Sequence, residues 1–210
     1  MGIDKLSAEL LGEPVLLWTI RAFADCAIVE EIIVVTSAEK RNWVEELSAK
    51  GNFSKPFIIV EGGIERHLSV WKGMEAASGG AEFLAVHDGA RPLVTPEAIS
   101  LCVDAAKASG AATLAHPIVD TVKRCSEAGI VIEPVEREGL WAMETPQIFA
   151  PELLRKAYRC ILDRGEVVTD EVSAVQAMGV DVRVVPFDQP NLKITFPGDL
   201  SLAESILGSR

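Results

Sequence analysis

The sequence predicts a Rossmann-like α/β fold, in which helices cover both faces of a doubly wound, mostly parallel sheet. Two observations support this prediction. Short apolar, β-branched segments alternate along the chain with amphipathic segments of helical period, which is the order typical of such sheets. The length of 210 residues and the hydrophobic content of 49% suit one domain with a full core. We therefore expect residues 1–210 to form a single domain.

Local signals locate each element of this fold. Ser37 precedes one helical pattern, and Thr95 precedes the Pro96 that opens another, as expected of N-cap residues. Strands are expected over residues 32–36, 57–60, 83–86, 111–117 and 182–185. Helices are expected over residues 16–24, 38–49 and 151–162, after the glycine pair 62–63, and from residues 95, 169 and 196.

Residues 120–149 interrupt this alternation. They show strand-like patterning and turns but no helical period, and apolar and charged residues are interleaved. A two-stranded arm of this kind is marginally stable by itself. We therefore expect the arm to pack on a second subunit and predict a homodimer. A β-extension folded onto its own domain remains the alternative.

The charge balance limits the class of partner. The net charge of −11 argues against non-specific binding to nucleic acid, which requires a basic surface. No apolar run reaches the roughly 20 residues that span a bilayer, and no signal segment is recognisable. The four cysteines are scattered without metal-binding spacing, as expected of reduced thiols. These observations predict a cytoplasmic protein without a membrane partner.

The strongest candidate site is the His-Asp-Gly-Ala-Arg-Pro segment at residues 87–92. It follows a buried strand, so Asp88 is expected at the carboxyl edge of the sheet, where open α/β sheets bind ligands. A carboxylate can hold Mg²⁺, and the nearby Arg91 can face phosphate oxygens. The alternative is that Asp88 caps the next helix and pairs with Arg91. His87 lacks a second ligand at metal spacing and is expected to be a core or hydrogen-bonding residue.

Other segments extend this pattern. No glycine-rich phosphate loop of the usual spacing occurs, but a glycine turn precedes Arg66 and Ser69. The further segments are Asp-Lys-Leu at 4–6, Asp-Thr-Val-Lys at 120–123, Arg-Glu-Gly-Leu-Trp at 137–141, Glu-Thr-Pro-Gln at 144–147, Thr-Asp-Glu at 169–171 and Asn-Leu-Lys-Ile-Thr at 191–195. Together and in this order, they resemble the 2-C-methyl-D-erythritol 4-phosphate cytidylyltransferase family. Residues 87–92 and 191–195 are the most specific parts of the resemblance.

The resemblance implies a nucleotide-diphospho-sugar transferase type of fold and a defined reaction. Family members transfer CMP from CTP to methylerythritol phosphate with Mg²⁺ and release pyrophosphate. The motif matches imply catalytic roles for Lys5, Arg137 and Lys193, and they imply that Thr121, Arg137 and Thr145 are arm residues that reach across a dimer. They imply CTP contacts at Gly63, Arg66, Ser69 and Asp88, a metal contact at Asp88, and substrate contacts at Arg91, Thr121, Thr145 and Thr169.

The chain departs from the family pattern at its beginning. The family's first strand, its glycine-rich loop and an arginine would all precede Met1, so we expect further residues before Met1 in the native protein. A chain that begins at Met1 is expected to be unstable or inactive, and a non-catalytic nucleotide-binding protein is then one alternative. A ribitol 5-phosphate cytidylyltransferase is the other, since it shares the nucleotide half of these motifs.

Overall fold

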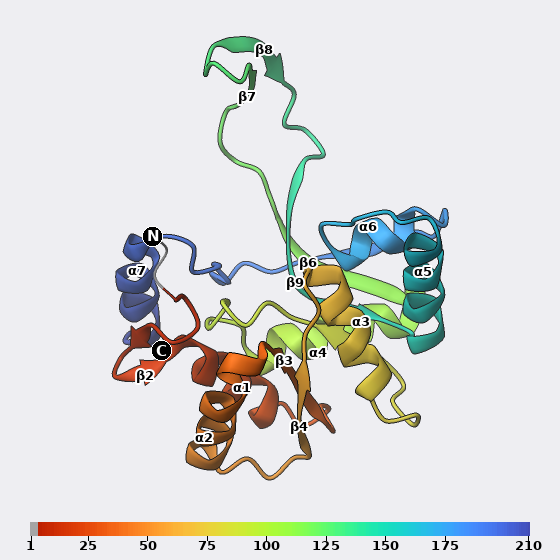
Figure 1. Cartoon of the computed structure of the whole chain (residues 1–210). Helices are drawn as coiled ribbons and strands as arrows, with labels where there is room; N and C mark the ends of the chain where they lie inside the picture. The colour runs from red at the N-terminus through yellow and green to blue at the C-terminus, as the bar shows by residue number, and fades with distance from the viewer. Residues whose placement is uncertain (1–3) are drawn as a thin grey trace.

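Strands and helices alternate along residues 4–210, the part of the chain that this computed structural model describes (Figure 1). The strands are β1 (Glu9–Leu10), β2 (Glu13–Pro14), β3 (Ile32–Thr36), β4 (Phe57–Glu61), β5 (Leu84–Val86), β6 (Ala111–Pro117), β7 (Val122–Cys125), β8 (Val131–Val135), β9 (Trp141–Phe149) and β10 (Arg183–Pro186). The helices are α1 (Val15–Asp25), the 3-10 turn η1 (Ala38–Lys40), α2 (Arg41–Gly51), α3 (Arg66–Ala76), α4 (Pro96–Ser109), α5 (Pro151–Asp163), α6 (Glu171–Gln176) and α7 (Pro197–Leu207).

The central sheet has four strands in the order β10-β6-β9-β5. β10 runs parallel to β6, whereas β9 is antiparallel to both β6 and β5. A separate parallel pair, β3 and β4, is covered by α2 and α3. The predicted α/β class with mostly parallel strands is therefore confirmed: β5, β6 and β10 run in one direction, and β9 runs opposite to its neighbours in the central sheet.

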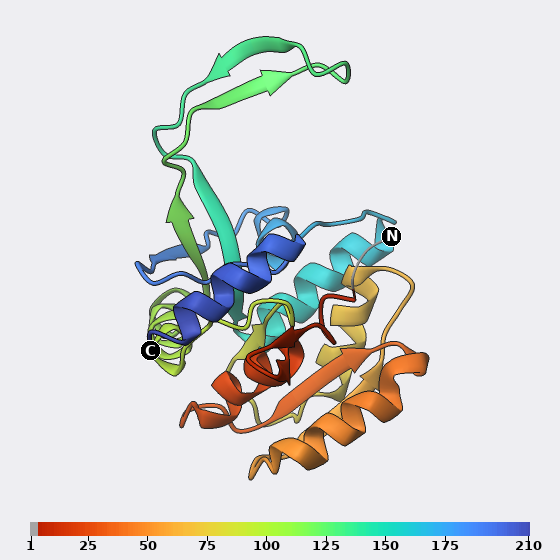
Figure 2. The same cartoon turned by 90° about the vertical axis from the view of Figure 1, so that its left-hand side faces the viewer.

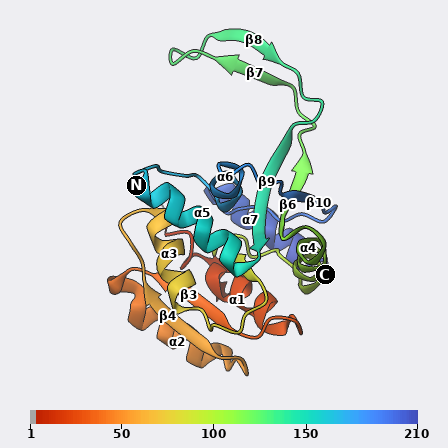
Figure 3. The same cartoon turned by 90° about the vertical axis from the view of Figure 1, so that its right-hand side faces the viewer.

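The central sheet buries both of its faces (Figure 3). On one face, Ala112, Leu114 and Ile148 pack against α4, with Ile99 and Cys102 in the same cluster. On the other face, Ala111 and Phe149 pack with α5 residues, among them Leu154, Tyr158 and Ile161. Neighbouring residues of β6 and β9 thus face opposite layers, as the two-residue period of a strand requires. The sheet is packed on both faces, and the site residues lie at its edge.

The arm is shorter than predicted. β7 and β8 pair only with each other and project from the body in Figures 1 and 2. The expected arm covered residues 120–149, but β9 lies between β6 and β5, and residues 144–149 are buried. The alternation of apolar and polar residues in β9 suits a central strand as well as an arm strand. Only the pairing of β9 with β6 and β5 distinguishes the two positions. The arm exposes Val119, Ile130 and Ile132.

The remaining elements follow the local signals closely. Thr95 caps α4 by accepting the N–H of Ala98 at 3.2 Å, as predicted. Ser37 makes no side-chain cap, because η1 precedes α2 and displaces its first turn. α7 packs through Ala203 against Leu10 and Ile194. Within residues 4–210, no helix combines the length and apolarity required to cross a membrane.

Candidate active site

The turn after β5 places Asp88 and Arg91 side by side. The Arg91 N–H donates to the Asp88 carbonyl at 3.0 Å, which closes the turn. Gly89 packs closely against α1, since a Cβ there would lie 3.0 Å from Leu16 Cδ1. The Thr19 hydroxyl donates to the Gly89 carbonyl at 2.9 Å and ties the turn to α1. The predicted juxtaposition of an acid and a cation at this edge is present.

Three cations surround the Asp88 carboxylate. Lys193 Nζ lies 3.0 Å from Oδ2, Arg91 Nε lies 3.6 Å from Oδ2, and Arg66 Nη2 lies 3.5 Å from Oδ1. The Asp88 side chain is 16% exposed and the Lys193 side chain 44%. Burial alone would raise the pKa of Asp88, but the hydrogen bond from Lys193 and the charges of Arg66 and Arg91 lower it. Asp88 is therefore ionised at neutral pH, and the cluster has an excess of positive charge.

The segment that carries Lys193 is fixed to the Asp88 turn and to β9. The Ile194 N–H donates to the Ala90 carbonyl at 2.8 Å, and Arg91 Nη1 donates to the Asn191 carbonyl at 2.7 Å. The buried Asn191 side chain donates to Glu144 Oε2 and to the Thr145 carbonyl, both at 2.8 Å. These bonds fix the backbone on both sides of Lys193 relative to Asp88.

His87 and Thr145 hold the same turn in place through hydrogen bonds to its backbone. Thr145 Oγ1 accepts the Asp88 N–H at 3.0 Å and lies 3.0 Å from His87 Nδ1, while His87 Nε2 lies 3.3 Å from the Arg91 carbonyl. Burial lowers the pKa of His87 to about 4, so the ring is neutral at neutral pH. The Arg91 carbonyl requires a proton on Nε2, which leaves Nδ1 to accept the Thr145 hydroxyl. His87 is thus a hydrogen-bonding core residue, as predicted.

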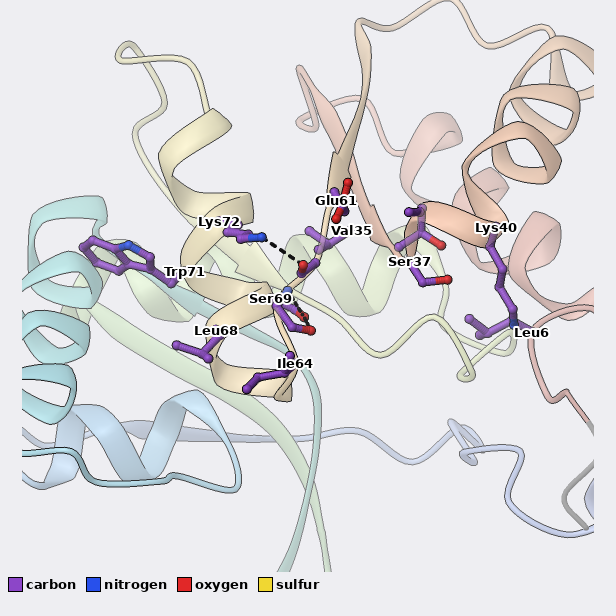
Figure 4. Close-up of a pocket in the computed structure, with 14 residues that line it drawn as sticks. Leu6, Val35, Ser37, Lys40, Glu61, Ile64, Leu68, Ser69, Trp71 and Lys72 are labelled. Atoms are coloured by element: carbon purple, nitrogen blue, oxygen red, sulfur yellow. Dashed lines mark hydrogen bonds between the residues drawn. The ribbon is translucent and has the colours of Figure 1, made fainter.

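A cavity of about 810 Å³ opens beside this cluster, at the carboxyl ends of β3 and β4 (Figure 4). The glycine turn and α3 form one wall, and Lys40 and Leu6 lie on the opposite side in Figure 4. A Cβ on Gly62 would lie 2.7 Å from Ser69 Oγ, and one on Gly63 would lie 2.5 Å from Leu68 Cβ. The turn therefore needs both glycines to approach α3 this closely.

Two of the predicted CTP contacts line this cavity. Ser69 Oγ accepts the Gly63 N–H at 3.1 Å, and Lys72 Nζ donates to the Gly62 carbonyl at 2.9 Å, as Figure 4 shows. Ser69 therefore shapes the turn as well as facing the cavity. Arg66 begins α3 one helical turn before Ser69 and connects the cavity wall to Asp88.

A buried carboxylate holds Arg66 from the other side. Glu171, the first residue of α6, accepts hydrogen bonds from Arg66 Nη1 at 2.7 Å and from Nη2 at 3.1 Å. The Tyr158 hydroxyl donates to the same carboxylate at 2.9 Å. Burial opposes the charge on Arg66, but Glu171 outweighs it and raises the Arg66 pKa. Glu171 was not among the predicted site residues; its signal in the sequence is an acid directly after the Asp170 helix cap.

The other predicted residues lie outside the Asp88 cluster. Thr169 is exposed before α6, and Thr121 and Arg137 lie in the exposed segments that join the arm to the body. Arg137 donates to the Val119 carbonyl. Among the ion pairs that Asp88 forms with residues 4–210, none involves Lys5. These positions remain predictions, because nothing in the single chain tests a role in substrate binding.

Lys5 instead lies near the start of α7. The N–H groups of Phe196 and Thr195 lower the pKa of Asp199, and the charge of Lys5 contributes to the same shift. Its neighbour Leu6 lines the cavity and would lie 3.3 Å from a Cβ on Gly89. Leu6 therefore lies between the cavity and the Asp88 turn.

The site offers limited protein ligands for a metal. Across residues 4–210, no group of three or more His, Cys, Asp or Glu side chains is arranged to hold a metal ion. A single ionised carboxylate, Asp88, is available at the cluster. This arrangement fits Mg²⁺, which proteins commonly hold through one or two carboxylates together with substrate phosphates.

Comparison with known proteins finds a family model and relatives that share one name. The family model described as 2-C-methyl-D-erythritol 4-phosphate cytidylyltransferase matches residues 1–209. The protein of that name from Caldanaerobacter subterraneus is 41% identical over 207 residues, which cover 98% of this chain and 91% of the relative. The protein of the same name from Desulforamulus reducens is 38% identical over 209 residues, covering 99% of this chain and 89% of the relative.

Solved structures agree with the fold. The crystal structure of 4-diphosphocytidyl-2C-methyl-D-erythritol synthase from Anaerococcus prevotii superposes with a TM-score of 0.87 at 26% identity, covering 97% of this chain and 93% of the other. The 2-C-methyl-D-erythritol 4-phosphate cytidylyltransferase from Thermus thermophilus gives a TM-score of 0.81 at 32% identity, covering 97% and 94%.

Proposed function

The chain belongs to the 2-C-methyl-D-erythritol 4-phosphate cytidylyltransferase family, and we propose that its site joins CTP to 2-C-methyl-D-erythritol 4-phosphate. It is a nucleotidyltransferase of the non-mevalonate route to isoprenoid precursors. In the reaction, a phosphate oxygen of the acceptor forms a bond to the α-phosphorus of CTP. The bond from that phosphorus to the bridging oxygen breaks, and pyrophosphate leaves.

The observation that supports this chemistry is the cation cluster around Asp88. Both reactants are anions, so the protein must bring them together and neutralise charge rather than supply covalent chemistry. Lys193, Arg66 and Arg91 all lie within 3.6 Å of one carboxylate at one edge of the sheet. No general base is needed, because the attacking phosphate is already ionised at neutral pH.

In this proposal, the cavity binds the nucleoside of CTP, and the cations near Asp88 bind the phosphates. The glycine turn with Gly63 and Ser69 would contact the nucleoside of CTP, and Arg66 lies between this turn and Asp88. Lys5, Lys193 and Arg137 would stabilise the phosphates in the transition state. Arg91, Thr121 and Thr169 would contact the acceptor substrate. The implied contact at Thr145 would instead act through the Asp88 turn, because Thr145 is 4% exposed and its hydroxyl bonds the Asp88 N–H.

Mg²⁺ would be held by Asp88 together with the phosphates of CTP. The metal supplies charge neutralisation on the triphosphate. Asp88 fits this role because its carboxylate is ionised. The chain itself contributes the orientation of that carboxylate through the Thr145 hydrogen bond to the Asp88 N–H.

A homodimer would complete the site. The arm exposes Val119, Ile130 and Ile132, and Arg137 lies in the exposed segment between β8 and β9, where it bonds the Val119 carbonyl. Packing the arm on a second copy would cover these apolar side chains and carry Thr121 and Arg137 to the partner's site. The free state of all four cysteines is in keeping with a cytoplasmic location.

A substrate panel tests the proposed reaction. The protein is incubated with CTP and either 2-C-methyl-D-erythritol 4-phosphate or ribitol 5-phosphate, with Mg²⁺ present or removed by chelation, and pyrophosphate release is followed. We expect release only with the methylerythritol substrate and Mg²⁺. Release only with ribitol 5-phosphate would replace the acceptor, and CTP binding without release would favour a non-catalytic nucleotide-binding protein.

Subunit mixing tests the role of the arm. Arg137→Ala and Lys193→Met are prepared separately, then mixed and allowed to exchange subunits. If the arm completes the partner's site, each mixed dimer contains one intact site, and activity on the order of a quarter of the wild-type value returns. If each arm serves its own subunit, both sites of the mixed dimer are defective and the mixture stays inactive.

A further inference from the structure

Glu171 is a completely buried carboxylate that pairs with a cation on another helix. Its side chain is 0% exposed, and both of its oxygens accept hydrogen bonds from the Arg66 guanidinium. A buried charge without a partner is strongly unfavourable. Among residues 4–210, Arg66 is the only cation within 4 Å of this carboxylate. The pair is therefore obligatory, and Glu171 cannot itself contact a substrate.

Arg66 lies between two carboxylates of different character. Nη1 and Nη2 both donate to Glu171, and Nη2 also lies 3.5 Å from Asp88 Oδ1. The distance to Asp88 is longer than the 2.7–2.9 Å typical of a charge-assisted hydrogen bond. Arg66 therefore approaches Asp88 without forming a two-pronged pair with it. The Arg66 side chain is 37% exposed, which leaves part of the guanidinium open to a ligand.

The position of Glu171 is itself fixed by the central sheet. Gln147 Oε1 on β9 accepts the N–H groups of Glu171 and Val172, both at 3.1 Å. Asp170 caps the same helix end by accepting the Ser173 N–H at 3.0 Å. The first turn of α6 is therefore held to β9, and Glu171 projects from a fixed backbone toward Arg66. A rigid chain of contacts thus runs from β9 through Glu171 and Arg66 to Asp88.

We propose that Glu171 is a positioning residue for the transfer reaction, which holds Arg66 in a bidentate pair and thereby keeps it from closing onto Asp88. The inference rests on the proposed function. Without the Glu171 charge, the nearest carboxylate for the guanidinium is Asp88. Arginine then shifts to a bidentate pair with Asp88, because that geometry suits the guanidinium best. Asp88 and Arg66 are both withdrawn from the substrate phosphates as a result.

Two single variants separate charge from packing. Glu171→Gln keeps the volume and removes the charge, whereas Tyr158→Phe removes a hydrogen bond to the same carboxylate and leaves the Arg66 pair intact. We expect Glu171→Gln to lower kcat/KM for CTP at least about tenfold. Tyr158→Phe is expected to lower the melting temperature but to change kcat/KM by less than about threefold. Equal losses in both variants, measured below both melting temperatures, would refute positioning.

A double variant gives a readout that a purely structural role would not move. If Glu171 acts through Arg66, then Arg66→Met abolishes its influence, and Glu171→Gln adds no further loss of kcat/KM in the Arg66→Met background. Multiplicative losses in the double variant would overturn the proposal. Full activity of Glu171→Gln would overturn it as well.

A measurement without turnover distinguishes this proposal from the proposed reaction. Asp88→Asn is introduced into the wild type and into Glu171→Gln, and the change in melting temperature is compared. Since Arg66 would pair closely with Asp88 only in the Glu171→Gln background, we expect Asp88→Asn to lower the melting temperature more there. Equal shifts refute the positioning role. Failure of the wild-type protein to release pyrophosphate would refute only the reaction.

Discussion

Replacing Thr145 by valine tests the support of the Asp88 turn most directly. Thr145 is 4% exposed, and its hydroxyl bonds both the Asp88 N–H and His87 Nδ1. Valine keeps the shape of threonine but leaves one donor and one acceptor without partners. Each buried polar group left without a partner costs about 1–3 kcal/mol. Because the Asp88 N–H is only partly buried, we expect Thr145→Val to lower the free energy of unfolding by about 2–4 kcal/mol.

Urea denaturation of Thr145→Val, Thr145→Ser and wild type measures this effect. Serine keeps the hydroxyl and loses only one methyl group, so its cost is expected to be about 1 kcal/mol. kcat should follow the same order, since the turn that Thr145 supports carries Asp88 and Arg91. Equal stability of the valine and serine variants would show that the hydroxyl does not hold the turn, and the argument for His87 as its second partner would fail too.

Three further outcomes concern the same site. Lys5→Ala is expected to lower kcat roughly 10²- to 10³-fold, as when one preorganised donor is lost, and steady-state pyrophosphate release measures it; unchanged turnover removes Lys5 from the mechanism. Because its folded pKa is lowered, Asp88 stabilises the native state above its ordinary pKa of 3.8 and loses this contribution as the pH falls through the lower folded value. The difference in unfolding free energy between wild type and Asp88→Asn, measured in urea, should therefore be constant above about pH 5 and shrink in acid, and a difference that grows in acid contradicts this. Gln147→Met keeps a similar volume but leaves two N–H groups of α6 unpaired, so stability should fall by about 2–4 kcal/mol; denaturation within about 0.5 kcal/mol of wild type would show that Gln147 is dispensable.

The predictable parts of this molecule are those that depend on neighbours in sequence. The Thr95-Pro96 start of α4, the glycine turn before α3 and the turn at residues 87–92 all formed as expected. Each combines a conformational preference with a partner only a few residues away. The approach of Arg66 and Lys193 to Asp88 joins distant segments, and it was expected from the family resemblance rather than from local signals; Lys5, expected with them, forms no ion pair with Asp88 in residues 4–210.

The parts that sequence reasoning missed depend on distant partners. β9 was assigned to the arm, since an alternating segment gives no sign of whether it pairs with β6 and β5 or with an arm strand. Glu171 was part of the quoted segment at residues 169–171 but received no role, because its partner, Arg66, lies 105 positions away along the chain. The expected Ser37 cap failed because η1 displaced the start of α2.

The misassigned strand is the element that organises the site. Three buried polar side chains project from β9, and each fixes a different segment that carries a functional charge. Glu144 holds the side chain of Asn191, near Lys193; Thr145 holds the N–H of Asp88; and Gln147 holds the N–H of Glu171, which in turn holds Arg66. Such groups are costly to bury unless they are paired, so the strand and the three segments fix one another. The geometry of the cation cluster is therefore set by the interior of the sheet, and the cations that face the substrates inherit their positions from it.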